Sequence, residues 1–257
     1  MTTTQQLKDA ATGVGATVQV AGFMIAVALV SVFAVGIYNL VSARDVLQGV
    51  SQEQLSDVAA SNFESVVLRL DAYGDLAAML ASDRGVVKAL GEFDSAYDEL
   101  PTTSTGEYDA DLLAAYEAEF ASAPVADDDP DPATLVPESA QAQYLQYWYI
   151  AQNPNEDRAM LDGASDGSSY SDVHASHHPA FRAVARGANL GDLVFVNLEG
   201  TVVYSVDKNI DVGTSLVGGP HSDSVLAHAA MEVGQDTGAG QSTSTDLEFY
   251  APALYAP

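Results

Sequence analysis

The chain has 257 residues, of which 36 are Asp or Glu, 9 are Lys or Arg and none is Cys. Its formal net charge of -27 repels phosphate, so we expect no nucleic-acid partner. The lack of cysteine excludes disulfide staples, thiolate zinc sites and cysteine nucleophiles. With 47% hydrophobic residues, the chain has enough apolar side chains to build a core.

One long apolar segment lies near the N-terminus. Residues 10–43 carry no charge over 34 positions, and residues 18–41 within them are almost entirely apolar. As an α-helix the latter segment reaches roughly 36 Å, enough to cross a hydrocarbon core about 30 Å thick. We therefore predict a transmembrane helix at 18–41, preceded by a short cytoplasmic N-terminus at 1–17. A cleaved signal peptide is the alternative, but its apolar region is only about 7 to 15 residues long.

The orientation of this span is set weakly by charge, since Lys8 precedes it and Arg44 follows it. No second apolar span follows in the remaining sequence, so we expect everything after about residue 43 to lie outside the bacterial inner membrane. That outer part is strongly acidic.

The outer part begins with a helical segment, predicted for residues 44–122. Apolar residues recur there at alternating steps of four and three, the spacing of a helix that packs on another helix. They are Ala59, Phe63, Val66, Leu70, Tyr73, Ala77 and Leu80. Since no proline occurs from 44 to 100, the membrane helix can continue outward as one rod, with glycines 74, 85 and 91 as weak points. A second helix carries Tyr108, Leu112, Tyr116 and Phe120 on one stripe.

The rest of the chain changes character after an acidic, proline-rich linker at 123–138. Within residues 139–257 we expect helices at 139–150, 171–186 and 222–233, a β-hairpin formed by 193–196 and 201–206, and a further strand at 242–250. The predicted fold class is thus α+β, with an antiparallel sheet that three strands leave incomplete. We therefore expect the 257 residues to be the N-terminal part of a longer protein.

Three histidines form the strongest local signal for chemistry. His174 and His178 lie one helical turn apart, a spacing at which neutral imidazoles bind zinc, copper or nickel. A zinc protease helix would carry Glu directly after the first histidine, whereas this chain has Ala175. One hypothesis is therefore a membrane-anchored, metal-binding hydrolase. The alternative is that these are ordinary core or surface histidines.

Several short motifs in a fixed order resemble one protein family. The stretches 144–155, 166–171, 178–182, 193–206, 211–216 and 246–252, with upstream segments at 70–73 and 86–97, are similar to the extracytoplasmic sensor region of bacterial methyl-accepting chemotaxis proteins. A similar module precedes some membrane adenylate/guanylate cyclases. Residues 189–192 depart from the family pattern, which has a Gly-aromatic-aromatic-Asp run before the first strand.

The resemblance implies a PAS-like, Cache-type sensor module on a long helix, followed in the family by a second transmembrane helix and a cytoplasmic output domain. It implies a receptor that is not an enzyme, with chemotaxis as the expected output and a cyclase as the alternative. We expect a homodimer, anchored in the membrane, that needs no cofactor and detects a small-molecule ligand or a periplasmic binding protein. The residues that we expect to line its site are Tyr147, Trp148, His174, His178, Arg182 and Tyr204. Arg182 is the natural partner for a carboxylate ligand.

Overall fold

The computed structural model describes residues 52–104, 106–122 and 131–235, together with residues 243, 245, 250 and 252. Within these residues the fold is α+β, as predicted, and combines helices with one antiparallel sheet of two strands. The span expected at 18–41 lies outside the described residues, as does most of the strand expected at 242–250. In the described part, no helix is both long and apolar enough to cross a membrane.

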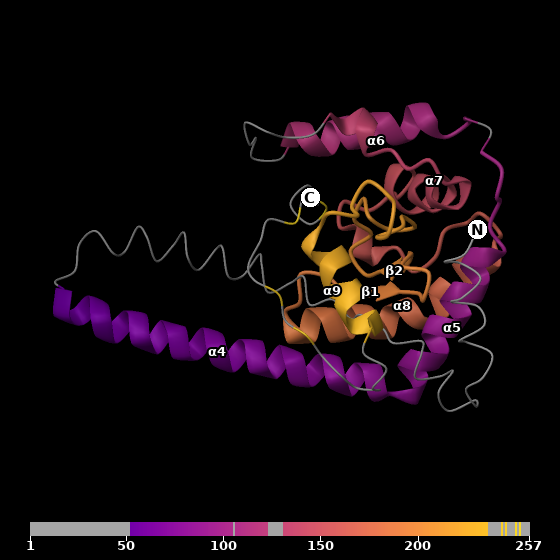
Figure 1. Ribbon diagram of the computed structural model, residues 1–257. Coiled ribbons are helices and arrows are strands. Elements are labelled where there is room, and N and C mark those ends of the chain that lie inside the picture. The colour runs from indigo at the N-terminus through magenta and orange to yellow at the C-terminus, as the bar shows by residue number, and fades with distance from the viewer. Residues whose placement is uncertain are drawn as a thin grey trace.

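The described chain begins with two consecutive helices, α4 (Gln52–Ser82) and α5 (Arg84–Asp98). The helix breaks at Asp83, whose carboxylate accepts hydrogen bonds from the backbone N–H groups of Gly85 and Val86 and so caps α5. The rod that the sequence allows therefore ends at Ser82, close to one of its three glycines. α4 projects from the body as an arm (Figure 1).

Helix α6 (Asp109–Ser122) lies on the opposite side of the body from α4 (Figure 1). Its predicted stripe is confirmed, because Leu112 and Tyr116 are fully buried. Tyr116 donates a hydrogen bond to the side chain of Gln146, and this side chain donates in turn to the carbonyls of Ile210 and Val212 at 2.8 and 2.9 Å. These bonds attach α6 to the rest of the body.

The predicted helix at 139–150 is divided into two parts. It begins as α7 (Ala140–Gln146), capped by Ser139, and continues as the π-helical turn η2 (Tyr147–Ala151). A π-turn holds more residues than an α-turn and so changes the direction in which successive side chains point. Short 3-10 turns flank this region, η1 (Pro132–Thr134) before it and η3 (Arg158–Met160) after it.

Helix α8 (Ser169–Ala188) confirms the helix expected at 171–186. It begins at the Ser168 cap, whose hydroxyl accepts from Ser171 N at 3.1 Å, and ends at Asn189, which adopts a left-handed conformation with φ of 54°. Helix α9 (Val225–Gln235) follows the sheet and corresponds to the helix expected at 222–233.

The predicted hairpin is present as β1 (Val194–Val196) and β2 (Val202–Ser205), with Phe195 opposite Tyr204. The carboxylate of Asp192 holds the open end of the hairpin. It accepts from the N–H groups of Leu193 and Val206 at 2.6 and 2.9 Å and from Asp207 N at 3.1 Å. Asp192 therefore joins the start of β1 to the end of β2 through its side chain.

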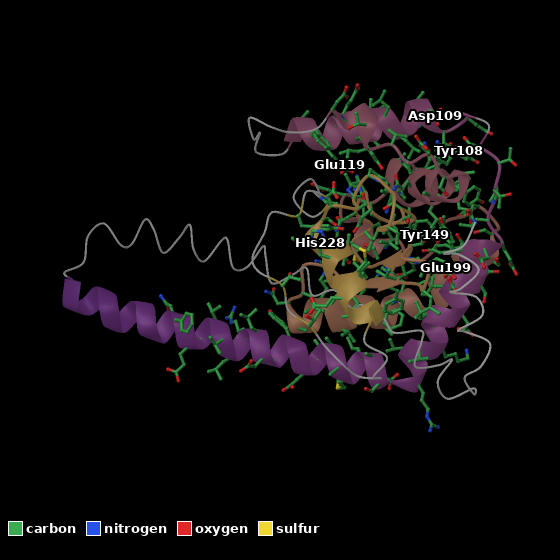
Figure 2. The ribbon with its side chains drawn as sticks, viewed as in Figure 1. Tyr108, Asp109, Glu119, Tyr149, Glu199 and His228 are labelled. Carbon is green, nitrogen blue, oxygen red and sulfur yellow. The ribbon has the colours of Figure 1, made fainter. Side chains whose placement is uncertain are left out.

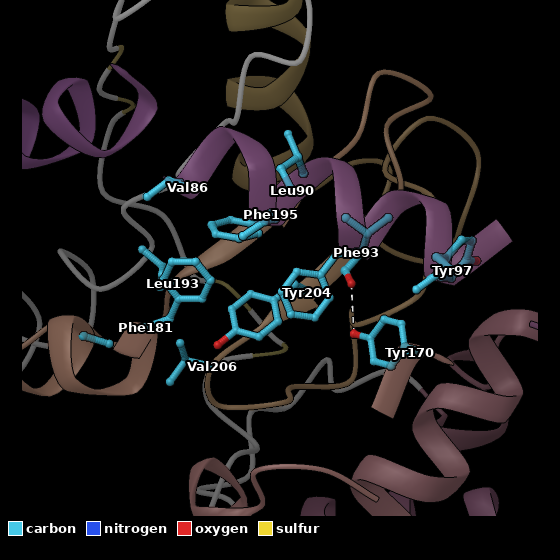
Figure 3. Close-up of a cluster of buried hydrophobic side chains, with 14 of the residues drawn as sticks. Val86, Leu90, Phe93, Tyr97, Tyr170, Phe181, Leu193, Phe195, Tyr204 and Val206 are labelled. Atoms are coloured by element: carbon cyan, nitrogen blue, oxygen red, sulfur yellow. Dashed lines mark hydrogen bonds between the residues drawn. The ribbon is translucent and has the colours of Figure 1, made fainter. Parts of the chain in front are cut away.

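The main core lies between α5, α8 and the hairpin and includes several packed aromatic rings (Figure 3). Phe93 of α5 packs at 4.5 Å from Tyr204 and at 5.6 Å from Tyr170, measured between ring centroids. Burying each such ring contributes about 1.5–3 kcal/mol. Tyr170 also donates a hydrogen bond of 2.9 Å to the carbonyl of Val203, so its hydroxyl is satisfied inside the core (Figure 3).

Candidate functional site

Four of the six expected site residues come together between α8 and β2. His174, His178 and Arg182 follow one another at steps of four along α8, so they share one face of the helix. The sheet supplies Tyr204 opposite them, at 5.5 Å from the His174 ring and 5.9 Å from the His178 ring. His174, His178 and Tyr204 are all at most 1% exposed.

The contacts of His178 fix its protons. Its Nε2 lies 2.6 Å from the carbonyl oxygen of Ala159, a separation that requires a proton on Nε2. Its Nδ1 lies 2.7 Å from the hydroxyl of Tyr204, so a neutral His178 accepts the hydroxyl proton of Tyr204 there. The ring is thus a neutral Nε2–H tautomer, with both nitrogens engaged.

Burial keeps both histidines uncharged. It lowers the pKa of His178 to about 4, with a further contribution from the nearby Lys208. Burial also lowers the pKa of His174 well below its usual value, again helped by Lys208 and then by His178, whose ring stacks on it at 4.3 Å. Near neutral pH the pair therefore contributes hydrogen bonds and no positive charge.

Lys208 is a site residue that the sequence did not indicate. Its side chain is only 1% exposed, and its Nζ lies 3.1 Å from both the carbonyl oxygen of Val206 and Nε2 of His178. Since Nε2 of His178 already carries a proton, a charged ammonium cannot donate to it, whereas a neutral amine can share that proton. Burial lowers the pKa of Lys208 to about 7, opposed by the charges of Asp192 and Asp207. An amine that is partly neutral near pH 7 fits this geometry.

Arg182 lies at the outer side of the cluster, with its side chain 18% exposed. Its Nη1 donates to the carbonyl oxygen of Ala159 at 2.7 Å and to the carboxylate of Asp162 at 2.6 Å. The Ala159 oxygen therefore accepts from both Arg182 and His178. Asp162 is also bound through its main chain, because its carbonyl oxygen lies 2.5 Å from Nδ1 of His174.

The loop 161–168 covers this cluster and connects it to the π-turn. Besides the two contacts of Asp162, the backbone N–H of Ala164 donates to the hydroxyl of Tyr149 at 3.4 Å. Tyr149 comes from η2, and its ring lies 4.6 Å from that of His174. A Cβ on Gly163 would lie 3.0 Å from the carbonyl of Ser171, so glycine allows the loop to pack closely on α8.

The other two expected residues, Tyr147 and Trp148, lie in a separate aromatic group. Tyr147 stacks on Tyr108 at 4.4 Å, Trp148 contacts Tyr147 at 5.3 Å, and Tyr144 completes the group at 6.1 Å from Tyr108. All four rings are half-buried, and Tyr108 adjoins the start of α6 (Figure 2). Tyr149, the next residue of η2, lies against the ring of His174 instead, because successive side chains of a helical turn point in different directions.

The site offers little to a metal ion. Among the residues that the structure describes, no group of three or more His, Cys, Asp or Glu side chains is placed to hold one. The two nitrogens of His178 and Nδ1 of His174 are already engaged in hydrogen bonds.

A comparison with protein-family models, with curated proteins and with solved structures finds no match to this chain.

Proposed function

We propose that this chain is the sensory part of a membrane-anchored chemoreceptor of the methyl-accepting type, with a PAS/Cache-like module outside the membrane. One observation carries the proposal: a buried cluster of ionisable side chains lies at the base of a long projecting helix. In the sequence, that helix follows the uncharged segment 10–43. A ligand site joined to a rod that leads toward a membrane is what a transmembrane sensor needs.

The arm carries an apolar stripe that supports dimerisation. The stripe continues along α4 from residues that pack on the body, Ala77 and Leu80, to residues that face solvent. Phe63 is 71% exposed, and Val66 and Leu70 are each 37% exposed. The side chains of this part of α4 stand clear of the body (Figure 2). The arm of a second copy, parallel to the first, would cover this stripe, whose spacing of four and three residues is that of paired helices.

A direct contact joins the site to the arm. Tyr73 of α4 donates a hydrogen bond of 3.5 Å to the carbonyl oxygen of Asn189, the residue that caps α8. Because α8 carries the two histidines and Arg182, a change in the position of α8 reaches α4 through this end. A ligand transmits a signal along this route by favouring one arrangement of α8 and α4 over another.

The lack of cysteine makes the dimer easy to test. Leu70 and Ala72 are both exposed on α4. Because they are two positions apart in the sequence, they point about 200° apart around the helix. In cell membranes that contain the full chain, an oxidant should crosslink Leu70→Cys efficiently and Ala72→Cys poorly. A panel of amino acids, small carboxylic acids and amines should include a compound that changes the Leu70→Cys crosslinking rate.

Two results would overturn the proposal. One is a chain that alkaline carbonate releases from the membrane fraction, because a spanning helix resists this extraction. The other is equal crosslinking of the two cysteine variants, which would mean that the apolar stripe does not face a second copy.

A further inference from the structure

The few positive charges of this acidic chain are concentrated around one place. Of its nine Lys and Arg residues, four lie between positions 158 and 208. Three have carboxylate partners within 4 Å: Arg158 with Glu119, Arg186 with Asp157, and Arg182 with Asp162. Lys208 has no carboxylate at that distance among the described residues.

The pair of Arg182 and Asp162 differs from the other two pairs. The Arg158 and Glu119 side chains are both largely buried, at 11% and 6% exposed, and the Arg186 and Asp157 side chains are both about half exposed. The Arg182 side chain is only 18% exposed, whereas the Asp162 side chain is 51% exposed. The guanidinium of Arg182 therefore lies mostly inside the fold, and the carboxylate of Asp162 lies over it on the solvent side. Water or a solute can therefore replace Asp162 without removing Arg182 from its place.

The geometry points to Arg182 as the receptor for the carboxylate of a small acidic ligand, which displaces the carboxylate of Asp162. This inference depends on the proposed sensor function and deepens it, because it gives the ligand class and the step that binding triggers. The chain's own Asp162 occupies the site in the absence of ligand.

Charge and shape favour a small monocarboxylate over other anions. Nη1 of Arg182 donates to both the carbonyl oxygen of Ala159 and one carboxylate oxygen of Asp162, and a ligand carboxylate can take the place of the latter as a charge-assisted acceptor. Asp162 itself and the carboxylates of Asp157 and Asp207, which pair with Arg186 one turn along α8, repel a second negative charge. A phosphate or dicarboxylate would thus bind less well than acetate.

Displacement of Asp162 removes one of the contacts that attach the loop 161–168 to the site. Asp162 attaches the loop 161–168 to α8 twice, through its carboxylate to Arg182 and through its carbonyl oxygen to His174. When the carboxylate contact is exchanged for a ligand, the loop keeps only its main-chain contacts there. The exchange therefore removes a contact between the loop and α8, the helix whose capping residue contacts the arm.

The test is a calorimetric titration of the full chain with sodium acetate, against sodium chloride at equal ionic strength and against acetamide. Acetate should bind and acetamide should not, because only acetate carries the charge. In Asp162→Asn, the internal competitor is gone. An ion pair with a half-exposed carboxylate favours the closed form by a factor of about two to five, so the dissociation constant for acetate should fall about three- to six-fold.

Two matched variants locate the site. Arg182→Gln should weaken acetate binding more than ten-fold, whereas Arg186→Gln, which removes the same charge one turn along α8, should leave it unchanged. An affinity that Asp162→Asn leaves unchanged or lowers would overturn the inference, and so would equal effects of the two arginine variants. If acetate fails but an amine or amino acid alters the Leu70→Cys crosslink, the ligand class is wrong and the sensor function stands.

Discussion

Replacement of Lys208 by methionine should remove the gain in stability that this lysine contributes at alkaline pH. Lys208 has its pKa lowered by burial from 10.5 to about 7 in the folded chain. Between these values the unfolded chain holds a proton that the folded chain does not, so stability rises with pH in this window. Methionine has a similar length and no charge, and both residues carry a Cβ, so the left-handed backbone at φ 58° is equally strained in each.

The expected size follows from the shift. One site that binds a proton only in the unfolded state changes the free energy of unfolding by about 1.4 kcal/mol per pH unit. From pH 8 to 9.5 Lys208 should contribute a gain of about 2 kcal/mol, or about 4–8 °C in Tm for a body of this size, relative to a chain without it. The window lies above the pKa of Asp207 and Asp211, each raised by burial to about 7, and below that of Arg158, which burial lowers to about 10. Buried tyrosines such as Tyr170 and Tyr204 have a raised pKa and lower the stability of both chains alike as the pH nears 10, so the difference between the two chains isolates Lys208.

The assay is urea unfolding of the full chain at four pH values, followed by the fluorescence of Trp148, its one tryptophan. Lys208→Met should lack the gain that Lys208 contributes, so the unmodified chain should rise by about 2 kcal/mol relative to it between pH 8 and 9.5. Lys88→Met is the control, since the Lys88 side chain is 70% exposed, and it should keep the slope of the unmodified chain. If Lys208→Met and the unmodified chain rise equally with pH, the lysine is not held in the buried environment described above.

Two further predictions concern the scaffold of the site, and urea midpoints check both. Gly213→Ala should lower the free energy of unfolding by about 3 kcal/mol, because the new Cβ would lie 2.8 Å from Ala142 Cα and the backbone φ is 79°. Gly167→Ala is the control: its φ is 75°, but no atom lies within 4 Å of the new Cβ, so it should lower the free energy of unfolding by only about 1 kcal/mol. Equal costs would show that close packing at Gly213 is unimportant. Gln146→Leu should lower the free energy of unfolding by about 2–4 kcal/mol, since it leaves two main-chain carbonyls and the Tyr116 hydroxyl without their partner. A loss under about 1 kcal/mol would mean that these three groups find other partners.

The elements of the fold were largely predictable because their patterns are local. The helix expected at 171–186 is α8, two residues longer at each end, and the strands expected at 193–196 and 201–206 are β1 and β2 with slightly shorter bounds. The break at Asp83 lies two residues before Gly85, one of the three expected weak points, but the sequence did not single out that glycine, because no proline marks the position. Its signal is an aspartate two positions before a glycine, where the carboxylate caps the next helix.

The candidate site was predictable only where it follows one helix face. His174, His178 and Arg182 share a face through their spacing, whereas Tyr147 comes from another helical segment, and which of its aromatic residues faces α8 depends on tertiary packing that no residue pattern marks. Lys208 was missed because its position depends on the path of the chain after β2, and the scarcity of lysine, three residues in the whole chain, was the one hint.

The π-helical turn η2 (Tyr147–Ala151) also gives this scaffold a means of divergence. Such a turn contains one residue more than an α-helical turn, so loss of a single codon there would rotate the following aromatic side chains by about 100°. A different ring would then face His174, while the caps, the hairpin and the arm stay in place. Descendants of one ancestral gene can in this way acquire new chemical preferences through a deletion that leaves the architecture intact.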